Sequence, residues 1–169
     1  AWHGRIDLGQ DYLVTTKYYK DNPEAFDFAK DIIRRCDLGI KDIKIYSRQD
    51  EKGADIYFPM FEHEADVKNN TLTFFLQSSG TKALYLILPL YRAVLALGGL
   101  LVLDEFDINF HPHMLPILVG LFEDENFNPK NAQMIFSTHN SEIMDEMGKY
   151  RTVLINQEHS ESYGYRVDE

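Results

Sequence analysis

The most constraining feature of this sequence is a run of four apolar residues that ends in acidic side chains. Leu100 to Leu103 form the run, and Asp104, Glu105 and Asp107 follow it. A short continuous apolar run is typical of a strand that is buried on both faces of a sheet. Carboxylates crowded at a buried strand end are tolerable when a divalent cation offsets their charge. The run therefore predicts a buried strand whose carboxyl end binds a cation.

A second buried strand is expected over residues 132–137, and it ends in a polar cluster that contains Ser137, Thr138, His139 and Asn140. In open α/β sheets, ligands bind beyond the carboxyl ends of the strands, so we expect the two strand ends to form one site. There a second carboxylate, beside the one that holds the cation, serves as general base toward a water molecule. His139 is placed to stabilise charge that develops on a phosphate.

A third polar cluster, Gln77 to Thr81, opens a long apolar helix that we expect from about Lys82 to Leu97. The free N–H groups and the positive dipole end at a helix start favour an anion, and Gly80 lets the backbone approach it closely. Simple helix capping by the serine and threonine side chains is the alternative interpretation. Pro89 is expected to kink this helix.

The other elements predict an α/β fold. A helix that begins at Asn22 and Pro23 is followed by strands at about 40–46, 55–61 and 71–75, and these elements occupy the N-terminal segment, residues 1–75. Over residues 76–169, strands alternate with helices at 111–122 and 141–147, which implies a mostly parallel sheet flanked by helices. Strands at 152–156 and 163–167, joined by the polar segment 157–162, predict a C-terminal β-hairpin. The chain length of 169 residues fits a single domain.

Composition does not support nucleic acid or a membrane as a partner, although a local basic patch that binds nucleic acid stays open. A net charge of −10 gives no overall field that attracts nucleic acid or an anionic membrane. Basic residues between Lys30 and Lys52 are interleaved with acidic ones, as on a solvated face. Cys36 is the only cysteine, so no internal disulfide forms, and we expect it in the core. The first ten residues lack the apolar region of a signal peptide, and the longest apolar run is interrupted, so we expect a cytoplasmic protein without a membrane span.

The order of the three clusters resembles the C-terminal half of an ABC-type P-loop ATPase. Ser-x-Gly-Thr-Lys comes first, four apolar residues with Asp-Glu come second, and Ser-Thr-His comes third. The sequence is similar in particular to AAA-type ATP-binding proteins related to the overcoming-lysogenization-defect (OLD) family, many of them in bacterial anti-phage systems. The resemblance runs from about Phe28 to Glu169 and implies a P-loop NTPase-like fold that binds and hydrolyses ATP with Mg²⁺.

The resemblance implies a role for each residue at the strand ends. Leu100 to Asp104 resembles the Walker B strand, in which Asp104 holds Mg²⁺ through water. Glu105 resembles the catalytic base, and His139 resembles the switch histidine.

The resemblance also implies contacts across a dimer. The signature loop, Gln77 to Thr81, would contact the γ-phosphate of ATP held by a partner subunit. Nucleotide contacts are expected from the following residues: Ser78, Ser79, Gly80, Thr81, Asp107 and Asn109. The segment Asp107 to His111 resembles the D-loop, which crosses the dimer interface. Two subunits of such proteins sandwich two ATP molecules, and hydrolysis drives an attached effector, often a nuclease.

Two departures from this family's pattern matter. No G-x-x-x-x-G-K-[ST] motif occurs in the sequence, so the resemblance implies that the P-loop and its strand lie N-terminal to this segment in the intact protein. The chain would then be a C-terminal fragment or half of a split domain, inactive by itself. Related sheets place the P-loop strand between the strands near Ser137 and Thr152. Without it those two strands pair directly, leave a gap or borrow a strand. His111 stands where many D-loops have Asp.

Two other functions remain open on the sequence alone. Asp104, Glu105 and Asp107 could form the two-metal site of a nuclease, although such sites usually draw on several strands. The chain could also be a non-catalytic dimerisation module. His111 and His113 flank Pro112, and a structural role explains their spacing better than zinc, because no third ligand is evident.

Overall fold

The computed structural model describes residues 8–36, 39–64 and 70–168. The described α-helices are α1 (Leu8–Asp21), α2 (Pro23–Arg35), α3 (Ser79–Leu97), α4 (Leu115–Glu123) and α5 (Ser141–Met147). The strands are β1 (Ile40–Gln49), β2 (Asp55–His63), β3 (Thr71–Thr73), β4 (Leu100–Leu103), β5 (Gln133–Phe136), β6 (Val153–Glu158) and β7 (Glu161–Arg166). Three short 3₁₀ turns complete the described elements: Phe74–Leu76, Pro112–Met114 and Lys149–Arg151.

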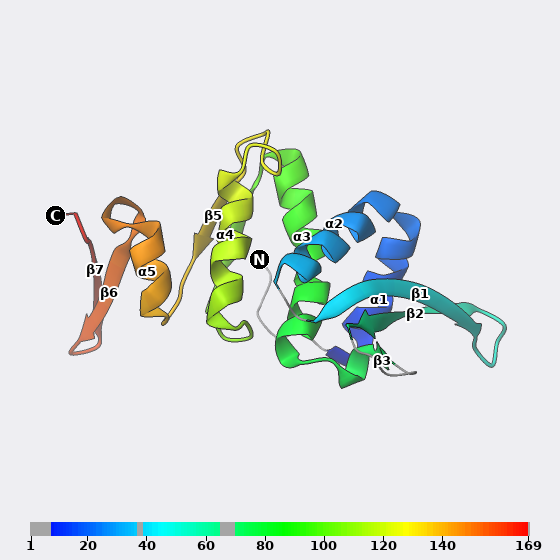
Figure 1. Cartoon of the computed structure of the whole chain (residues 1–169). Coiled ribbons are helices and arrows are strands. Elements are labelled where there is room, and N and C mark those ends of the chain that lie inside the picture. The colour runs from blue at the N-terminus through cyan, green and yellow to red at the C-terminus, as the bar shows by residue number, and fades with distance from the viewer. Residues whose placement is uncertain (1–7, 37–38, 65–69, 169) are drawn as a thin grey trace.

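The elements form three groups along the molecule (Figure 1). At one end, α1 and α2 lie with the antiparallel sheet β1-β2-β3. The middle contains α3 and α4 with the pair β4-β5, and the other end contains α5 with the hairpin β6-β7. The expected α/β class is confirmed. The parallel pairing of β4 with β5 agrees with the parallel sheet expected over residues 76–169, although this pair is its whole extent among the described residues. The sheet β1-β2-β3 and the hairpin β6-β7 are antiparallel, as expected for the N-terminal strands and the C-terminal hairpin.

The parallel pair β4-β5 is buried on one face rather than on both. Leu101 and Leu103 are buried, whereas Leu100 and Val102 are 52% and 62% exposed. On β5, Ile135 is 58% exposed on the same side, since it pairs with Val102. Successive side chains of a strand point to opposite faces, so this alternation means that the described chain covers only one side of the pair. The prediction of a doubly buried strand is therefore wrong for this chain.

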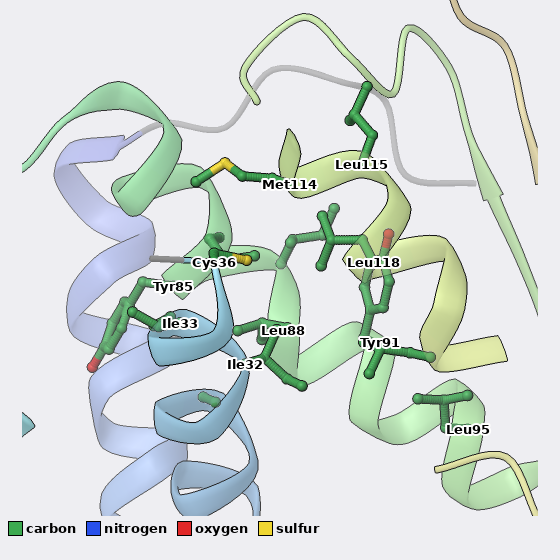
Figure 2. Close-up of a cluster of buried hydrophobic side chains, with 14 of the residues drawn as sticks. Ile32, Ile33, Cys36, Tyr85, Leu88, Tyr91, Leu95, Met114, Leu115 and Leu118 are labelled. Carbon is green, nitrogen blue, oxygen red and sulfur yellow. The ribbon is translucent and has the colours of Figure 1, made fainter. Parts of the chain in front are cut away.

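The core lies between three helices, with α3 at its centre (Figure 2). Ile32, Ile33 and Cys36 come from α2 and its C-terminal end, and they meet Leu88 on α3. Leu118 approaches α3 from α4. Burying a side chain of this size contributes about 1.5–3 kcal/mol. Helix α3 carries more buried residues than α2 or α4, so it contributes most to this part of the core.

Local signals explain where α3 begins and ends. The Ser78 hydroxyl accepts a hydrogen bond from the backbone N–H of Thr81 at 3.1 Å and so caps the helix. Gly98 ends it in the left-handed conformation, with φ of +72°, and a Cβ there would lie 2.7 Å from the carbonyl oxygen of Lys130. The helix runs as one element through Pro89, so the expected kink does not interrupt it.

Helix α3 is the one helix of the described residues with the length and apolarity to cross a membrane. In this fold, 44% of the apolar window is buried against other elements of the chain. Helix α3 is therefore packed as a central helix of the core.

Two predicted element boundaries were wrong. The expected helix 111–122 begins as a 3₁₀ turn, and α4 follows from Leu115. Pro116 has no N–H to bond the carbonyl of Pro112, and it lies in the first turn of α4, where that N–H would have no helical partner in any case. In the C-terminal hairpin most of the expected polar connection is strand, and His159 and Ser160 make a two-residue turn with φ of +49° and +69°. Helix α1 was not expected from the sequence.

Strands β5 and β6 do not pair with each other, and β6 bonds only to β7 among the described residues. A cavity of about 730 Å³ lies between them, lined by β5, α5 and β6. Of the three arrangements expected without a P-loop strand, the described chain shows the gap.

We expect Tyr91→Phe to raise the free energy of unfolding by about 1 kcal/mol, because the Tyr91 hydroxyl is buried and has no hydrogen-bond partner among the described residues. Tyr19→Phe is the matched control. Its hydroxyl donates to the carbonyl oxygen of Tyr85 at 2.9 Å, so this change should lower stability. Urea unfolding of both variants measures the difference. Equal losses in the two variants would contradict the absence of a partner at Tyr91.

Candidate functional site

The carboxyl ends of β4 and β5 lie side by side, and their pairing continues beyond the strands. The Ser137 N–H donates to the carbonyl oxygen of Leu103 at 3.0 Å, and the Phe106 N–H donates to the carbonyl oxygen of Ser137 at 2.9 Å. Phe106 is 3% exposed and anchors the segment in the core. The acidic residues on either side of Phe106 are therefore held against the polar segment that follows β5, as the sequence predicted.

Ser137 bonds to both acidic residues of the predicted Walker B end. Its hydroxyl accepts a hydrogen bond from the Glu105 N–H at 2.8 Å and donates one to Oδ1 of Asp104. Glu105 has φ of +48°, the left-handed conformation that non-glycine residues seldom adopt. Asp104 and Glu105 are both exposed, so a ligand can reach their side chains.

Asp107 contacts the segment of the predicted switch histidine. Its Oδ1 accepts a hydrogen bond from the backbone N–H of His139 at 3.3 Å. Burial by itself raises the pKa of the Asp107 carboxyl, but hydrogen bonds from Thr138 and from backbone N–H groups, together with the charge of His139, lower it. The net pKa lies below its ordinary value, so Asp107 is held as a carboxylate beside His139.

The predicted signature loop divides into an exposed and a buried half. Ser78 and Ser79 are exposed, whereas Gly80 and Thr81 are buried. The Ser78 hydroxyl lies 2.8 Å from the Thr81 hydroxyl, in addition to capping the helix. The capping interpretation is therefore satisfied, and the two serines are the residues of this loop that a ligand can reach.

The start of the loop is fixed by Gln77, which is 6% exposed. Its Nε2 donates to the carbonyl oxygen of Thr73 at 3.2 Å, and its Oε1 lies 3.0 Å from Nε2 of His63 on β2. An amide oxygen only accepts hydrogen bonds, so the proton of the His63 ring lies on Nε2. This pair ties the β1-β2 hairpin to the N-terminus of α3.

The signature loop packs against the predicted D-loop of the same chain. A Cβ on Gly80 would lie 3.2 Å from the carbonyl oxygen of Asn109, so only glycine fits without displacing the neighbour. A pocket of about 470 Å³ opens here, lined by both loops and by Cys36, His111 and His113. The rings of the two histidines lie 4.3 Å apart. The pocket is where a ligand would meet Ser78, Ser79 and Asn109 together.

The predicted site residues thus fall into two adjacent groups. Asp104, Glu105 and Asp107 lie with the segment 137–139, and the loop 78–81 lies with Asn109. No group of three or more His, Cys, Asp or Glu side chains among the described residues could hold a metal ion. This finding counts against a two-metal nuclease site. Mg²⁺ is usually bound by one or two carboxylates together with substrate phosphates and water, and the exposed Asp104 side chain is a donor of that kind.

Cys36 is buried, as expected. Burial raises the pKa of its thiol to about 11, so it is an unreactive thiol at neutral pH.

Sequence reasoning named Ser137 and Gln77 only as members of polar clusters and missed the contacts that they make. Ser137 stands 33 positions from Asp104, and no local pattern signals that their side chains bond. Gln77 was recognised only as the first residue of a polar cluster. A glutamine between an apolar segment and a helix cap is a weak signal for a buried amide.

Comparison with solved structures defines the class of fold. The chain matches a structure described as "Structural biochemistry of ATP-driven dimerization and DNA stimulated activation of SMC ATPases", with a TM-score of 0.62 and 12% sequence identity. The match covers 90% of this chain and 88% of that chain. The chain therefore shares the fold of an SMC ATPase.

The particular family follows from the sequence comparison. The family described as "AAA domain, putative AbiEii toxin, Type IV TA system" matches residues 3–145, and the chain belongs to this AAA domain family. No curated protein matches the chain.

We expect Gly120→Ala to raise the free energy of unfolding and Gly80→Ala not to raise it. Nothing lies within 4 Å of a Cβ on Gly120 in α4, so alanine there should raise the free energy of unfolding by about 0.5–1 kcal/mol. Gly80 also lies in a helix, but the Asn109 carbonyl oxygen resists its Cβ, so alanine there should give no gain. Denaturant unfolding of the two variants measures both effects. An equal gain at Gly80 would show that the two loops do not touch.

Proposed function

We propose that the chain contributes to Mg²⁺-dependent ATP hydrolysis in a dimeric ATPase. The observation that carries the proposal is the joining of two strand ends, which brings Asp104 and Glu105 against the segment that contains His139. Membership of the AAA domain family and the shared fold of an SMC ATPase support ATP as the ligand of this site.

Each residue at the strand ends has a separate chemical task in this proposal. Asp104 would hold Mg²⁺ through water, and the ion would supply positive charge that offsets the charge of the phosphates. Glu105 accepts a proton from the attacking water. His139 stabilises the charge that develops on the γ-phosphate. Asp107 supports this arrangement through its hydrogen bond with the backbone of His139.

The second group of residues fits a role across a dimer. Ser78 and Ser79 are exposed beside the N-terminus of α3, where hydroxyl and N–H donors favour a phosphate. Gly80 and Thr81 are buried and hold the backbone of the loop in place, and Asn109 lines the same pocket. In this proposal the loop contacts ATP held by a partner subunit. The related structure is described in terms of ATP-driven dimerization, which supports a homodimer.

The groove between β5 and β6 supports the proposal that a P-loop strand inserts there. Both strands leave an edge unpaired toward a cavity of about 730 Å³, among the described residues. The uncovered face of β4-β5, with Leu100, Val102 and Ile135, would be covered by the rest of the same ATPase half. That remaining part of the ATPase would supply the phosphate-binding loop that residues 1–169 lack.

The wider setting is also a proposal. Relationship to the OLD family, a role in bacterial anti-phage defence and a cytoplasmic location rest on the sequence resemblance. An attached nuclease or other effector would couple to the opening of the ATP-bound dimer.

We expect Glu105→Gln in the full-length protein to abolish Mg²⁺-dependent ATP turnover and to retain ATP binding. Without the base, the ATP-bound dimer should persist. Phosphate release measures turnover, and light scattering with and without ATP measures the dimer. Glu146→Gln on α5 is the control, because this glutamate lies outside the site and is exposed. Unchanged turnover in Glu105→Gln would remove Glu105 as the base.

We expect residues 1–169 alone to bind ATP without micromolar affinity, because the sequence holds no phosphate-cradling loop. Titration calorimetry with ATP and Mg²⁺ on the isolated chain tests this expectation. Adding the separately produced N-terminal half should restore binding. Micromolar affinity of the chain alone would show that no further loop is needed.

A further inference from the structure

We propose that Ser137 is the positioning residue that holds Asp104 and Glu105 in their working arrangement. The inference rests on the proposed ATPase function and concerns how the same site is assembled. Ser137 itself would touch neither the nucleotide nor the metal ion.

Ser137 makes four hydrogen bonds to the segment that contains the two acids. Two come from its backbone, to the carbonyl of Leu103 and from the N–H of Phe106. The other two come from its hydroxyl, which accepts from the Glu105 N–H and donates to the Asp104 carboxylate. One hydroxyl therefore uses its donor and an acceptor site to bridge two consecutive residues.

The bond to Glu105 stabilises a conformation that this residue would otherwise avoid. In a continuing strand, Asp104 and Glu105 would point to opposite faces. The left-handed φ of +48° at Glu105 ends that alternation, at a cost of about 1–2 kcal/mol for a residue with a side chain. The hydroxyl of Ser137 bonds the N–H of this same residue, so it favours the turned backbone over an extended one.

The bond to Asp104 selects which carboxylate oxygen remains free. Oδ1 accepts the Ser137 hydroxyl and keeps one lone pair, whereas both lone pairs of Oδ2 stay available, so Oδ2 is the oxygen better placed to bind a cation or its water. A carboxylate fixed in this way presents one oxygen in one direction. Supporting hydrogen bonds of this kind orient metal ligands and tune their affinity.

The exposure of Ser137 separates this role from a structural one. Ser137 is exposed, so its replacement leaves no core cavity and no buried group without a partner. Water can then solvate the freed N–H and carboxylate, and the free energy of unfolding should change little. The replacement instead removes the two hydrogen bonds that fix the Asp104 carboxylate and the Glu105 backbone relative to each other.

Three substitutions in the full-length protein test the proposal. Ser137→Ala removes the bridging hydroxyl, Ser137→Cys keeps the volume with a weak donor, and Ser137→Thr keeps the hydroxyl. We expect the Ala and Cys variants to lose about 10- to 100-fold in kcat, with KM for ATP within about twofold, and Thr to restore turnover. Ser162→Ala, an exposed serine on β7, is the matched control.

A second readout does not depend on turnover. Mn²⁺ binding in the presence of a non-hydrolysable ATP analogue, followed by electron paramagnetic resonance, should weaken about tenfold in Ser137→Ala and recover in Ser137→Thr. Thermal unfolding should place all variants close to the parent. A lowered melting temperature in Ser137→Ala that tracks the loss of activity would assign Ser137 a structural role and overturn the inference.

Glu105→Gln in the same assays separates the two claims. If it leaves turnover intact, Glu105 is not the base, and its role in the proposed function fails together with the inference. If it abolishes turnover while Ser137→Ala keeps kcat and Mn²⁺ affinity within about twofold of the parent, only the role of Ser137 is overturned.

Discussion

The parallel pairing of β4 with β5 is the constraint on which the candidate site depends. The register pairs Leu103 with Phe136, and hydrogen bonds continue past both strand ends to Phe106 and Ser137. Buried side chains on the inner face hold the pair against the helices. Because the pair is anchored from behind, the polar residues that follow it meet in one arrangement. A site built on regular, packed elements in this way is more precise than one carried by free loops.

The segment that follows Asp104 and Glu105 contacts both the end of β5 and the N-terminus of α3. Asp107 bonds the backbone of His139, and two residues later the carbonyl of Asn109 lies against Gly80. The strand ends and the N-terminus of α3 are therefore joined by direct contacts over a few residues. Gln77 and His63 extend this connection to the β1-β2 hairpin. Packed contacts of this kind are the physical means by which two regions of a site stay in register.

Local signals in the sequence predicted the strands β4 and β5, the helix α5 and the residues that gather at the strand ends, since apolar runs and polar ends are read within a few positions. The open face of β4 could not be predicted. Four apolar residues look the same whether the second face is covered by this chain or by another. The role of Ser137 was also out of reach, because it depends on contacts between segments more than 30 residues apart.

The unpaired edges of β5 and β6 have a consequence for the chain in concentrated solution. Each edge offers backbone donors and acceptors in a row, next to exposed aliphatic side chains such as Ile135 and Ile155. Such an edge is a template for strand addition by any extended segment nearby. While these edges stay uncovered, one copy of the chain can therefore pair with another through them, and the tendency grows with concentration.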